Sequence, residues 1–307
     1  MFYYQLHNLI IASSFELNEL EQTQDTSAHV TVTMVKQLPE IKEVIKEGKY
    51  YRDLDYRIGA QGQIQLTFQG LFDSMIHQDS QRIYVKMVEG SSLQEMKTHL
   101  LGTVLSFLLL NKSQFPIHAS AISTDEGAIL FMGHSGVGKS TTATLMMRAG
   151  FPIISDDVCL IELQKEQAWV SYAFPQVKLW EESTAYFNIP TKELEIVSNE
   201  RAKYKVPLTK KVTQNSFPIK AIFEIDFNDQ LKGIQIRSKT TMDKLQALLK
   251  HTYRHHAVKI LGLEKAHFEY CSKLIEAVPI YHLQRPKDLN LLDELVDRVV
   301  KQTQITS

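Results

Sequence analysis

One short segment, Gly133-His-Ser-Gly-Val-Gly-Lys-Ser140, constrains the fold of this chain more than any other. It matches the pattern G-x-x-x-x-G-K-[ST] of a phosphate-binding loop, which joins a buried strand to a helix. Both flanking elements are predicted here. The apolar run Ala128–Met132 precedes the motif, and residues Lys139–Ala149 predict a helix that ends before Gly150. The sequence therefore predicts a strand, a phosphate-binding loop and a helix in direct succession.

The residue types in this loop predict a site for nucleotide phosphates. Glycines allow backbone N–H groups to turn toward the ligand, and the helix N-terminus adds a partial positive charge. We expect Lys139 to reach the β- and γ-phosphates and the Ser140 hydroxyl to ligate Mg²⁺. The predicted nucleotide-binding residues are Gly133, His134, Ser135, Gly136, Val137, Gly138, Lys139, Ser140 and Thr141.

Two adjacent acids, Asp156 and Asp157, follow the next predicted strand, residues 151–155. A carboxylate at the end of such a strand faces the phosphates from the C-terminal edge of the sheet. One acid can hold Mg²⁺, while the other accepts the proton of an attacking hydroxyl. We expect Asp156 to act on the hydroxyl and Asp157 to lie nearer the metal with Ser140, and the reverse assignment stays open. In the simpler alternative, one acid binds Mg²⁺ and the other caps a turn.

Composition excludes several functional classes. The 307 residues include 34 Lys and Arg against 35 Asp and Glu, so the net charge of −1 provides no basic field for nucleic acid or an anionic membrane. The most apolar stretch, residues 100–110, is too short to span a bilayer, and the start of the chain lacks a secretion signal. Cys159 and Cys271 are too few for a disulfide framework, which favours a reducing compartment. We therefore expect a cytoplasmic protein without nucleic-acid or membrane partners.

The chain is predicted to contain two regions. Residues 1–95 alternate apolar and polar side chains and predict a β-rich accessory region, whose clearest strands are 29–34, 63–68 and 82–87. The charged segment 40–49 is expected to be a short helix or a solvated loop. Residues 96–307 predict the domain that carries the phosphate loop, with later helices over 239–261, 265–277 and 289–301. The predicted fold class is α/β with an N-terminal, mainly β region.

Three segments resemble the catalytic domain of HPr kinase/phosphorylase and its stand-alone relatives: Ile117-His-Ala-Ser-Ala121, the loop Gly133–Ser140, and Ile154-Ser-Asp-Asp157. An acid pair so soon after the phosphate loop is shared by this family and the phosphoenolpyruvate carboxykinases. Weaker similarities to the stand-alone branch lie in Lys178-Leu-Trp180, residues 203–208 and residues 280–286. Some members of that branch are tailoring kinases of ribosomal peptides, including lasso-peptide precursors.

The resemblance implies an HPr kinase-type domain that transfers the γ-phosphoryl group of ATP, with Mg²⁺, to a serine hydroxyl of a peptide or protein. It implies that Lys139 and Ser140 bind nucleotide and metal. It also implies that Asp156 or Asp157 is the catalytic carboxylate and that His118 is hydrogen-bonded to the pair. By itself, a histidine among small and apolar residues is more often a hydrogen-bonded core residue. Pyrophosphate is an alternative donor in this family.

Two departures from the family pattern bear on the direction of the reaction. Thr141 stands where the bifunctional enzymes usually have Glu, and no clear counterpart of their Glu-Ile-Arg-Gly signature follows the acid pair. We therefore expect phosphorylation without efficient phosphorolytic reversal. Two other functions stay open, namely a nucleotide-dependent switch or binding module that hydrolyses slowly and a kinase that acts on a small molecule.

Several other residues are candidates with a structural alternative. Lys178, Lys203 and Lys205 can bind phosphate or an acidic substrate, with help from Arg201, or they can belong to a solvated edge strand. Arg285 follows a predicted strand and can approach the adenine. His251 and His255 have a zinc-chelating spacing without a third ligand, so a charged helix face is predicted there. The N-terminal region can offer an edge strand to an extended peptide.

Overall fold

The computed structural model describes residues 1–51, 53–173, 176–198, 202–208, 212, 214–288 and 292–305. The chain forms two compact units. Unit 1 comprises Met1–Gln114 and Arg254–Glu264, and unit 2 comprises Phe115–Tyr253 and Lys265–Ser307. The division therefore falls after Gln114 and not near residue 95, because the helical segment that starts at Leu93 belongs with the N-terminal sheet.

The sheet of unit 1 has the strand order β3-β1-β2-β4-β9-β8-β7-β6-β5. Its strands are β1 (Phe2–Leu6), β2 (Leu9–Ser13), β3 (Glu21–Gln22), β4 (Val30–Met34), β5 (Val44–Tyr51), β6 (Leu54–Gly59), β7 (Ile64–Phe68), β8 (Phe72–Ile76) and β9 (Arg82–Met87). The three strands expected near residues 29–34, 63–68 and 82–87 are confirmed as β4, β7 and β9. The helix or loop expected over 40–49 is wrong, because β5 pairs with β6 and its polar side chains are tolerated at an exposed sheet edge.

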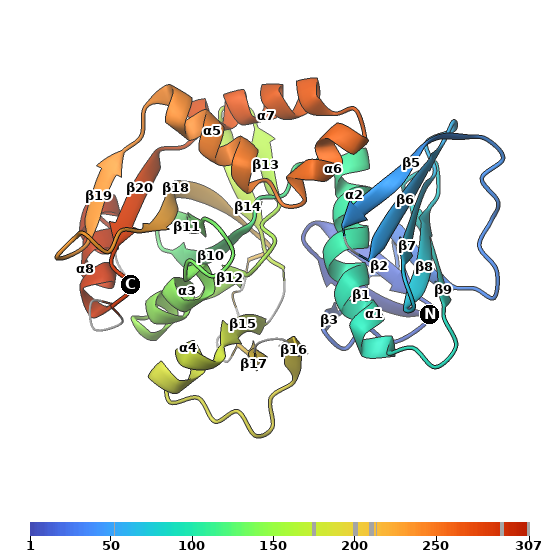
Figure 1. Cartoon of the computed structure of the whole chain (residues 1–307). Helices are drawn as coiled ribbons and strands as arrows, with labels where there is room; N and C mark the ends of the chain where they lie inside the picture. Colours follow the sequence, from blue (N-terminus) through green and yellow to red (C-terminus); the bar gives the residue numbers. More distant parts are fainter. Residues whose placement is uncertain are drawn as a thin grey trace. The chain divides into compact units, whose positions relative to one another are not determined.

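A helical segment packs on this sheet within unit 1 (Figure 1). It consists of α1 (Leu93–His99), the π-helical turn η1 (Leu100–Val104) and α2 (Leu105–Asn111). Phe107 is fully buried and its ring meets that of Tyr50 edge to face, with 5.3 Å between centroids. The short helix α6 (His255–Ile260) joins this unit, and Arg254 Nη2 donates to Thr103 Oγ1.

Unit 2 contains a central sheet with the order β12-β10-β11-β18-β14-β13, and β20 pairs with both β18 and β19. The strands are β10 (Ala119–Thr124), β11 (Gly127–Met132), β12 (Ile153–Ser155), β13 (Ile161–Gln164), β14 (Gln167–Ser171), β18 (Ser216–Phe227), β19 (Gln235–Ser238) and β20 (Ile280–Arg285). Strands β11, β18 and β20 run parallel to one another, whereas β10 is antiparallel to both β11 and β12.

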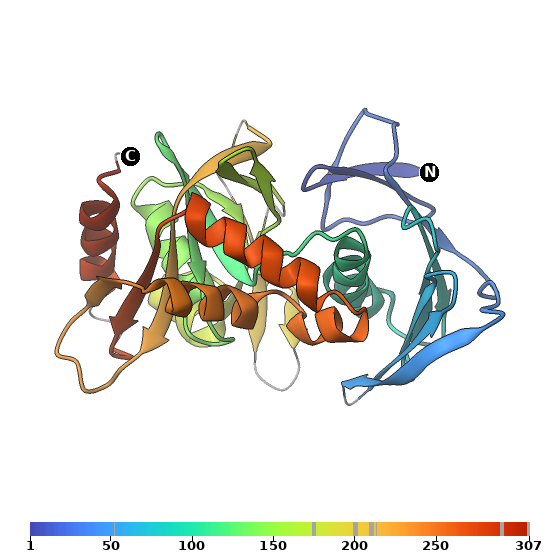
Figure 2. The ribbon, with the colours of Figure 1, turned by 90° about the horizontal axis from the view of Figure 1, so that it is seen from above.

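Helices cover both faces of this sheet (Figures 1 and 2). Ala128, Leu130 and Met132 of β11 pack in a core with α5 (Thr241–His251) and α7 (Glu264–Ala277). The intervening residues Ile129 and Phe131 pack in a second core with α3 (Lys139–Arg148) and α8 (Leu292–Thr303). The alternation of apolar side chains along one buried strand thus builds a three-layer α/β/α unit.

The helix expected over 239–261 is interrupted. Helix α5 ends at His251, Arg254 has a left-handed backbone with φ 58°, and α6 begins at His255. Because α5 belongs to unit 2 and α6 to unit 1, the break lies where the chain passes between the units. In the described part of the chain, no helix is long and apolar enough to cross a membrane.

A small separate sheet with the order β15-β17-β16 completes unit 2. Its elements are β15 (Gln176–Trp180), β16 (Ile196–Ser198) and β17 (Lys203–Pro207), and α4 (Glu181–Tyr186) follows β15 directly. Val177 and Leu179 of β15 point into the core beside α3, so Lys178 between them projects from the opposite face of the strand.

Candidate functional site

His118, the phosphate-loop motif and the acid pair meet at one edge of the central sheet. Strand β12 is antiparallel to β10, which is antiparallel to β11, so β11 and β12 run in the same direction. Their C-terminal ends, followed by Gly133 and Asp156, therefore lie at the same edge. Strand β10 runs the opposite way, and its start next to His118 lies at that edge too. This is the edge at which open α/β sheets bind ligands.

The backbone of the loop between β11 and α3 favours glycine at three positions. Gly133, Gly136 and Gly138 have φ values of 153°, 84° and 97°, which other residues rarely adopt. A Cβ atom on Gly133 would also lie 2.7 Å from the carbonyl oxygen of Ile225. Helix α3 begins at Lys139, so its first N–H groups have no partner within the helix and are available to an anion.

The Lys139 ammonium is held by the loop itself. Its Nζ donates to the carbonyl oxygens of Gly133 at 2.9 Å and His134 at 3.0 Å, and the residue is buried. Burial lowers the pKa of Lys139 to about 8, although Asp157 and Asp156 act in the opposite direction. A phosphate in the loop would offer this cation an anionic partner in place of neutral carbonyl groups.

Asp156 is hydrogen-bonded to Ser140, the last residue of the loop motif. Its Oδ1 accepts hydrogen bonds from Ser140 Oγ at 2.8 Å and from Ser120 Oγ at 2.5 Å, and its Oδ2 accepts from the backbone N–H of Lys178 at 3.0 Å. The carboxylate is buried and uses both oxygens. Of the two acids, it is therefore Asp156 that contacts Ser140, while the roles of the two acids toward a metal and an acceptor stay a prediction.

Asp157 directs its carboxylate to different partners because its backbone is left-handed, with φ 75°. Lys178 Nζ lies 3.0 Å from Oδ2, and His118 Nδ1 lies 3.3 Å from Oδ1. His118 Nδ1 is also 2.9 Å from the carbonyl oxygen of Asp157, so it carries the hydrogen and donates. A non-glycine residue in this conformation is strained, and such strain clusters at functional sites.

The charges around Asp157 keep it ionised, whereas burial keeps His118 neutral. Burial alone would raise the pKa of Asp157, but Lys178, His118 and Lys203 lower it well below its usual value. Burial would likewise lower the pKa of Lys178, but Asp157 raises it above the ordinary lysine value. For His118, burial lowers the pKa more than Asp157 raises it. At neutral pH the cluster therefore holds a carboxylate, an ammonium and a neutral imidazole.

These groups line a small pocket above the loop, with a volume of about 50 Å³. This is several times the roughly 10–15 Å³ that one water needs, so it suits a group the size of a phosphate and not a whole nucleotide. The lining residues are His118, Ser135, Gly136, Gly138, Lys139, Ser140, Thr141, Asp157, Lys178, Trp180 and Lys203.

The small sheet brings two of the three predicted lysines to this pocket. Lys178 pairs with Asp157, and Lys203 Nζ lies 5.1 Å from the centre of the Trp180 ring. Lys205 does not line the pocket; it is buried and its Nζ is 2.8 Å from Glu195 Oε1. Arg201 lies outside the described residues. Thr141 Oγ1 is hydrogen-bonded to Ser183 Oγ at 2.8 Å, which engages its hydroxyl with α4.

Oxygen atoms suited to Mg²⁺ lie at the pocket. Ser140 lines the pocket and donates its hydroxyl proton to Asp156, so its Oγ keeps lone pairs that can accept a metal. Mg²⁺ is commonly bound by one or two protein oxygens together with substrate phosphates and waters. In the described part of the chain, no cluster of three or more His, Cys, Asp or Glu side chains forms a metal cage. Ser140 therefore offers one hydroxyl oxygen to a metal ion at this pocket.

A second charged cluster beside the loop was not predicted. Glu224 of β18 accepts from His251 at 2.8 Å and from Lys239 at 2.7 Å, and the His251 ring contacts that of His134 edge to face. The His251 carbonyl also accepts the N–H of His118 at 2.8 Å. His251 is thus buried and not part of a charged helix face. Two features of the sequence could have pointed to Glu224 and Ser120. Glu224 is an acid near the end of a predicted buried strand, and Ser120 lies two residues after His118.

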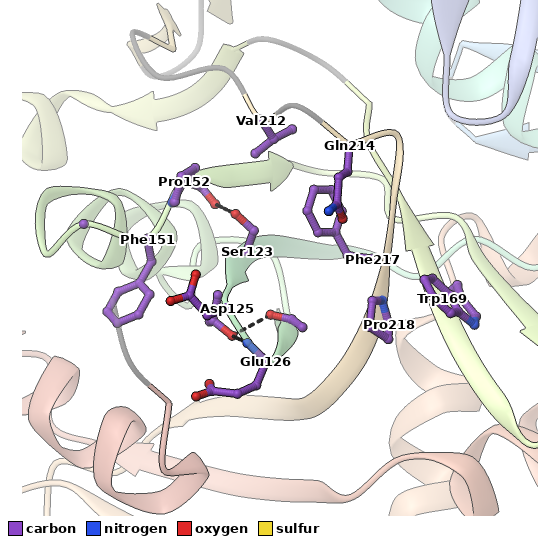
Figure 3. A pocket seen from close by; sticks show the side chains of 13 residues that line it. Ser123, Asp125, Glu126, Phe151, Pro152, Trp169, Val212, Gln214, Phe217 and Pro218 are labelled. Atoms are coloured by element: carbon purple, nitrogen blue, oxygen red, sulfur yellow. Dashed lines mark hydrogen bonds between the residues drawn. The ribbon is translucent and has the colours of Figure 1, made fainter.

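A larger cavity, of about 620 Å³, lies at the other end of β11 (Figure 3). Phe151, Trp169 and Phe217 surround it, and Asp125 and Glu126 come from the turn that precedes β11. Ser123 Oγ, also on its wall, donates to the Pro152 carbonyl at 3.4 Å. No predicted site residue lines this cavity, so it is separate from the pocket above the loop.

Comparison with known proteins finds weak structural similarity. No protein-family model matches the chain. No curated protein matches it either. Among solved structures, it is similar to the "Hpr(Ser) kinase/phosphatase from Coxiella burnetii", with 12% sequence identity and a TM-score of 0.34 over 61% of this chain and 95% of that chain. A TM-score of this size does not establish a shared fold.

Proposed function

We propose that this protein is an ATP- and Mg²⁺-dependent phosphotransferase that acts on a serine hydroxyl of a peptide or protein. The observation that carries the proposal is the division of the acid pair: Asp156 is bonded to Ser140 of the loop, and Asp157 lines the pocket with Lys178 and His118. A phosphoryl transfer needs one group of oxygens near the phosphates and metal, and a separate carboxylate at the acceptor.

The loop would bind the phosphate chain through its backbone N–H groups and Lys139. Lys139 would leave the carbonyl groups of Gly133 and His134 for the phosphate oxygens, which opens the pocket. Ser140 would hold Mg²⁺, with Asp156 behind it accepting the Ser140 hydroxyl proton, and the metal would offset negative charge on the phosphates. This assignment reverses the expected roles of the two acids, because Ser140 contacts Asp156.

Asp157 would orient the acceptor hydroxyl and take its proton late in the transfer. Lys178 holds the pKa of Asp157 far below its usual value, so this carboxylate is a weak base toward an alcohol in the ground state. It remains a good hydrogen-bond acceptor, and alignment of the hydroxyl with the γ-phosphorus supplies much of the rate enhancement in such reactions. Lys178 and Lys203 would offset the charge that develops on the transferred group.

A peptide acceptor is supported by the resemblance of the motifs to stand-alone serine kinases, and lasso-peptide precursors are one candidate class. The edge strand β5 is a poor place to capture that peptide. Its pairing with β6 is irregular at two points, and Lys46 Nζ caps the carbonyl groups of Lys259 and Ile260. Irregular pairing and lysines are features that block further strand addition. We therefore place peptide recognition at the Trp180 and Lys203 side of the pocket.

The test is phosphorylation of serine-containing peptides by the full chain with MgATP, followed by mass spectrometry. The proposal predicts phosphoserine, lost when the peptide carries Ser→Ala and when the enzyme carries Asp157→Asn. Metabolite alcohols are assayed in parallel under the same conditions. Phosphorylation of a metabolite alone would replace the peptide acceptor with a small molecule. ATP hydrolysis without any acceptor would indicate a nucleotide-dependent switch.

A further inference from the structure

Arg285 is a buried cation that lies directly against the phosphate loop. It ends β20, the strand next to β18, and only 2% of its surface is exposed. The Nη2 atom lies 2.6 Å from the point that a Cβ atom on Gly138 would occupy. Gly138 immediately precedes Lys139, the first residue of α3. The guanidinium therefore occupies the space that a side chain at this loop position would fill.

The charge of Arg285 has no acidic partner among the described residues. Its Nη1 donates to the carbonyl oxygen of Pro286 at 3.1 Å, while the buried Nε has no hydrogen-bond partner there. The guanidinium carbon lies 4.8 Å from the centre of the Phe227 ring, a cation–π contact. Burial lowers the pKa of Arg285, and no nearby carboxylate raises it.

A buried and unpaired guanidinium is unfavourable in the free protein. Arginine does not give up its proton in proteins, so it cannot relieve the cost of burial by becoming neutral. One aromatic ring and one carbonyl group replace only part of the lost hydration. A polyanion in the loop would supply the missing negative charge, and Coulomb attraction across a partly desolvated loop is stronger than in water.

We propose that Arg285 is a positioning residue of the phosphate site, whose fixed charge behind Gly138 raises the affinity of the loop for the negative charge of a phosphate chain. This inference rests on the proposed nucleotide site. It extends that site to the side of the loop opposite the acid pair, because β18 and β20 lie on one side of β11 and β12 on the other. The ligand class is a di- or triphosphate chain, supplied by ATP or by pyrophosphate.

The proposal predicts effects of opposite sign on the free protein and on binding. Arg285→Met removes the charge with little change in volume, so the free protein should keep or increase its melting temperature. Its affinity for MgATP and for magnesium pyrophosphate should fall by about tenfold or more, while AMP binding should change less, because AMP carries less charge. Arg285→Lys keeps the charge and should retain most of the affinity. Arg298→Met, on an exposed part of α8, is the matched control.

Titration calorimetry with ATP, pyrophosphate and AMP, together with thermal melts, decides between the outcomes. Binding of ATP and pyrophosphate by Arg285→Met at wild-type affinity would overturn the role of Arg285 and leave the nucleotide site intact. Equal losses for the Met and Lys variants, with lower melting temperatures for both, would make Arg285 a purely structural residue. If Arg285→Met does not fold, Arg285→Gln provides the same comparison. A wild-type chain that binds neither polyphosphate would overturn both this inference and the proposed function.

Discussion

Ser140 on helix α3 and Asp156 after strand β12 share a hydrogen bond of 2.8 Å across the edge of the sheet. The bond holds the Asp156 carboxylate against the phosphate loop. Asp157 has a left-handed backbone, and its carboxylate contacts Lys178 and His118 instead. Adjacent acids in the sequence thus contact different groups, and of the two only Asp157 lines the pocket. The account of the site depends on this division.

The division predicts different defects for the two Asp→Asn variants. Asp156→Asn should weaken the dependence on Mg²⁺ and the affinity for MgATP, because it removes a charge beside Ser140. Asp157→Asn should bind MgATP almost normally and lose transfer by about 10²–10⁴-fold, the usual range for loss of a residue that handles the acceptor proton. Metal titrations of binding and of transfer, run side by side, measure both effects. Superimposable metal profiles for the two variants would remove the case for separate roles.

Lys178 should matter to stability as well as to transfer. Lys178→Met leaves Asp157 ionised without its main cation, and an unsatisfied buried charge of this kind costs about 1–3 kcal/mol or more. The double variant Lys178→Met, Asp157→Asn should regain much of that stability but not the activity, because both partners are then uncharged. Urea denaturation of the single and double variants tests the coupling. Strictly additive losses of stability would mean that the two side chains do not interact.

The free energy of unfolding should depend on pH through the protonation of Lys139. Its pKa is about 8 in the folded chain and near 10.5 when unperturbed, so the unfolded state binds more protons between these values. The free energy of unfolding should therefore rise with pH from about 8 to 10.5 relative to Lys139→Met. A bound phosphate raises the pKa again, so MgATP binding near pH 8.5 should take up protons. Calorimetry in buffers with different ionisation heats detects this proton uptake. If MgATP binding took up no protons, Lys139 would not contact the phosphates.

The sequence predicted the parts of the site that depend on local chemistry. The loop motif specifies its flanking strand and helix because glycine conformations, helix start and apolar strand are all encoded within a few residues. The same holds for β4, β7 and β9, whose alternating side chains indicate strands directly. His118 could be placed near the acids only by resemblance, because its position depends on an antiparallel strand that returns to the same edge.

Other features depend on contacts between distant segments, and local patterns do not encode these. Glu224 and His251 meet across 27 residues, and Lys178 reaches Asp157 across 21. Strand β5 was missed because its charged side chains are those of a solvated segment, and only pairing with β6 makes it a strand. The sequence left the roles of the two acids open, because a positive φ at Asp157 has no signature in a sequence of non-glycine residues.

The central claim is that the loop at Gly133–Ser140 binds MgATP through Lys139, and calorimetric titration of the full chain with MgATP tests it most directly. Lys139→Met is compared with Lys232→Met, which changes an exposed lysine elsewhere in unit 2. The account predicts one MgATP site per chain, unchanged in Lys232→Met and weakened at least about tenfold in Lys139→Met, because loss of a charge-assisted bond to phosphate costs roughly 1.5–3 kcal/mol. Absence of MgATP binding by the wild-type chain, or equal binding by both variants, would contradict the account.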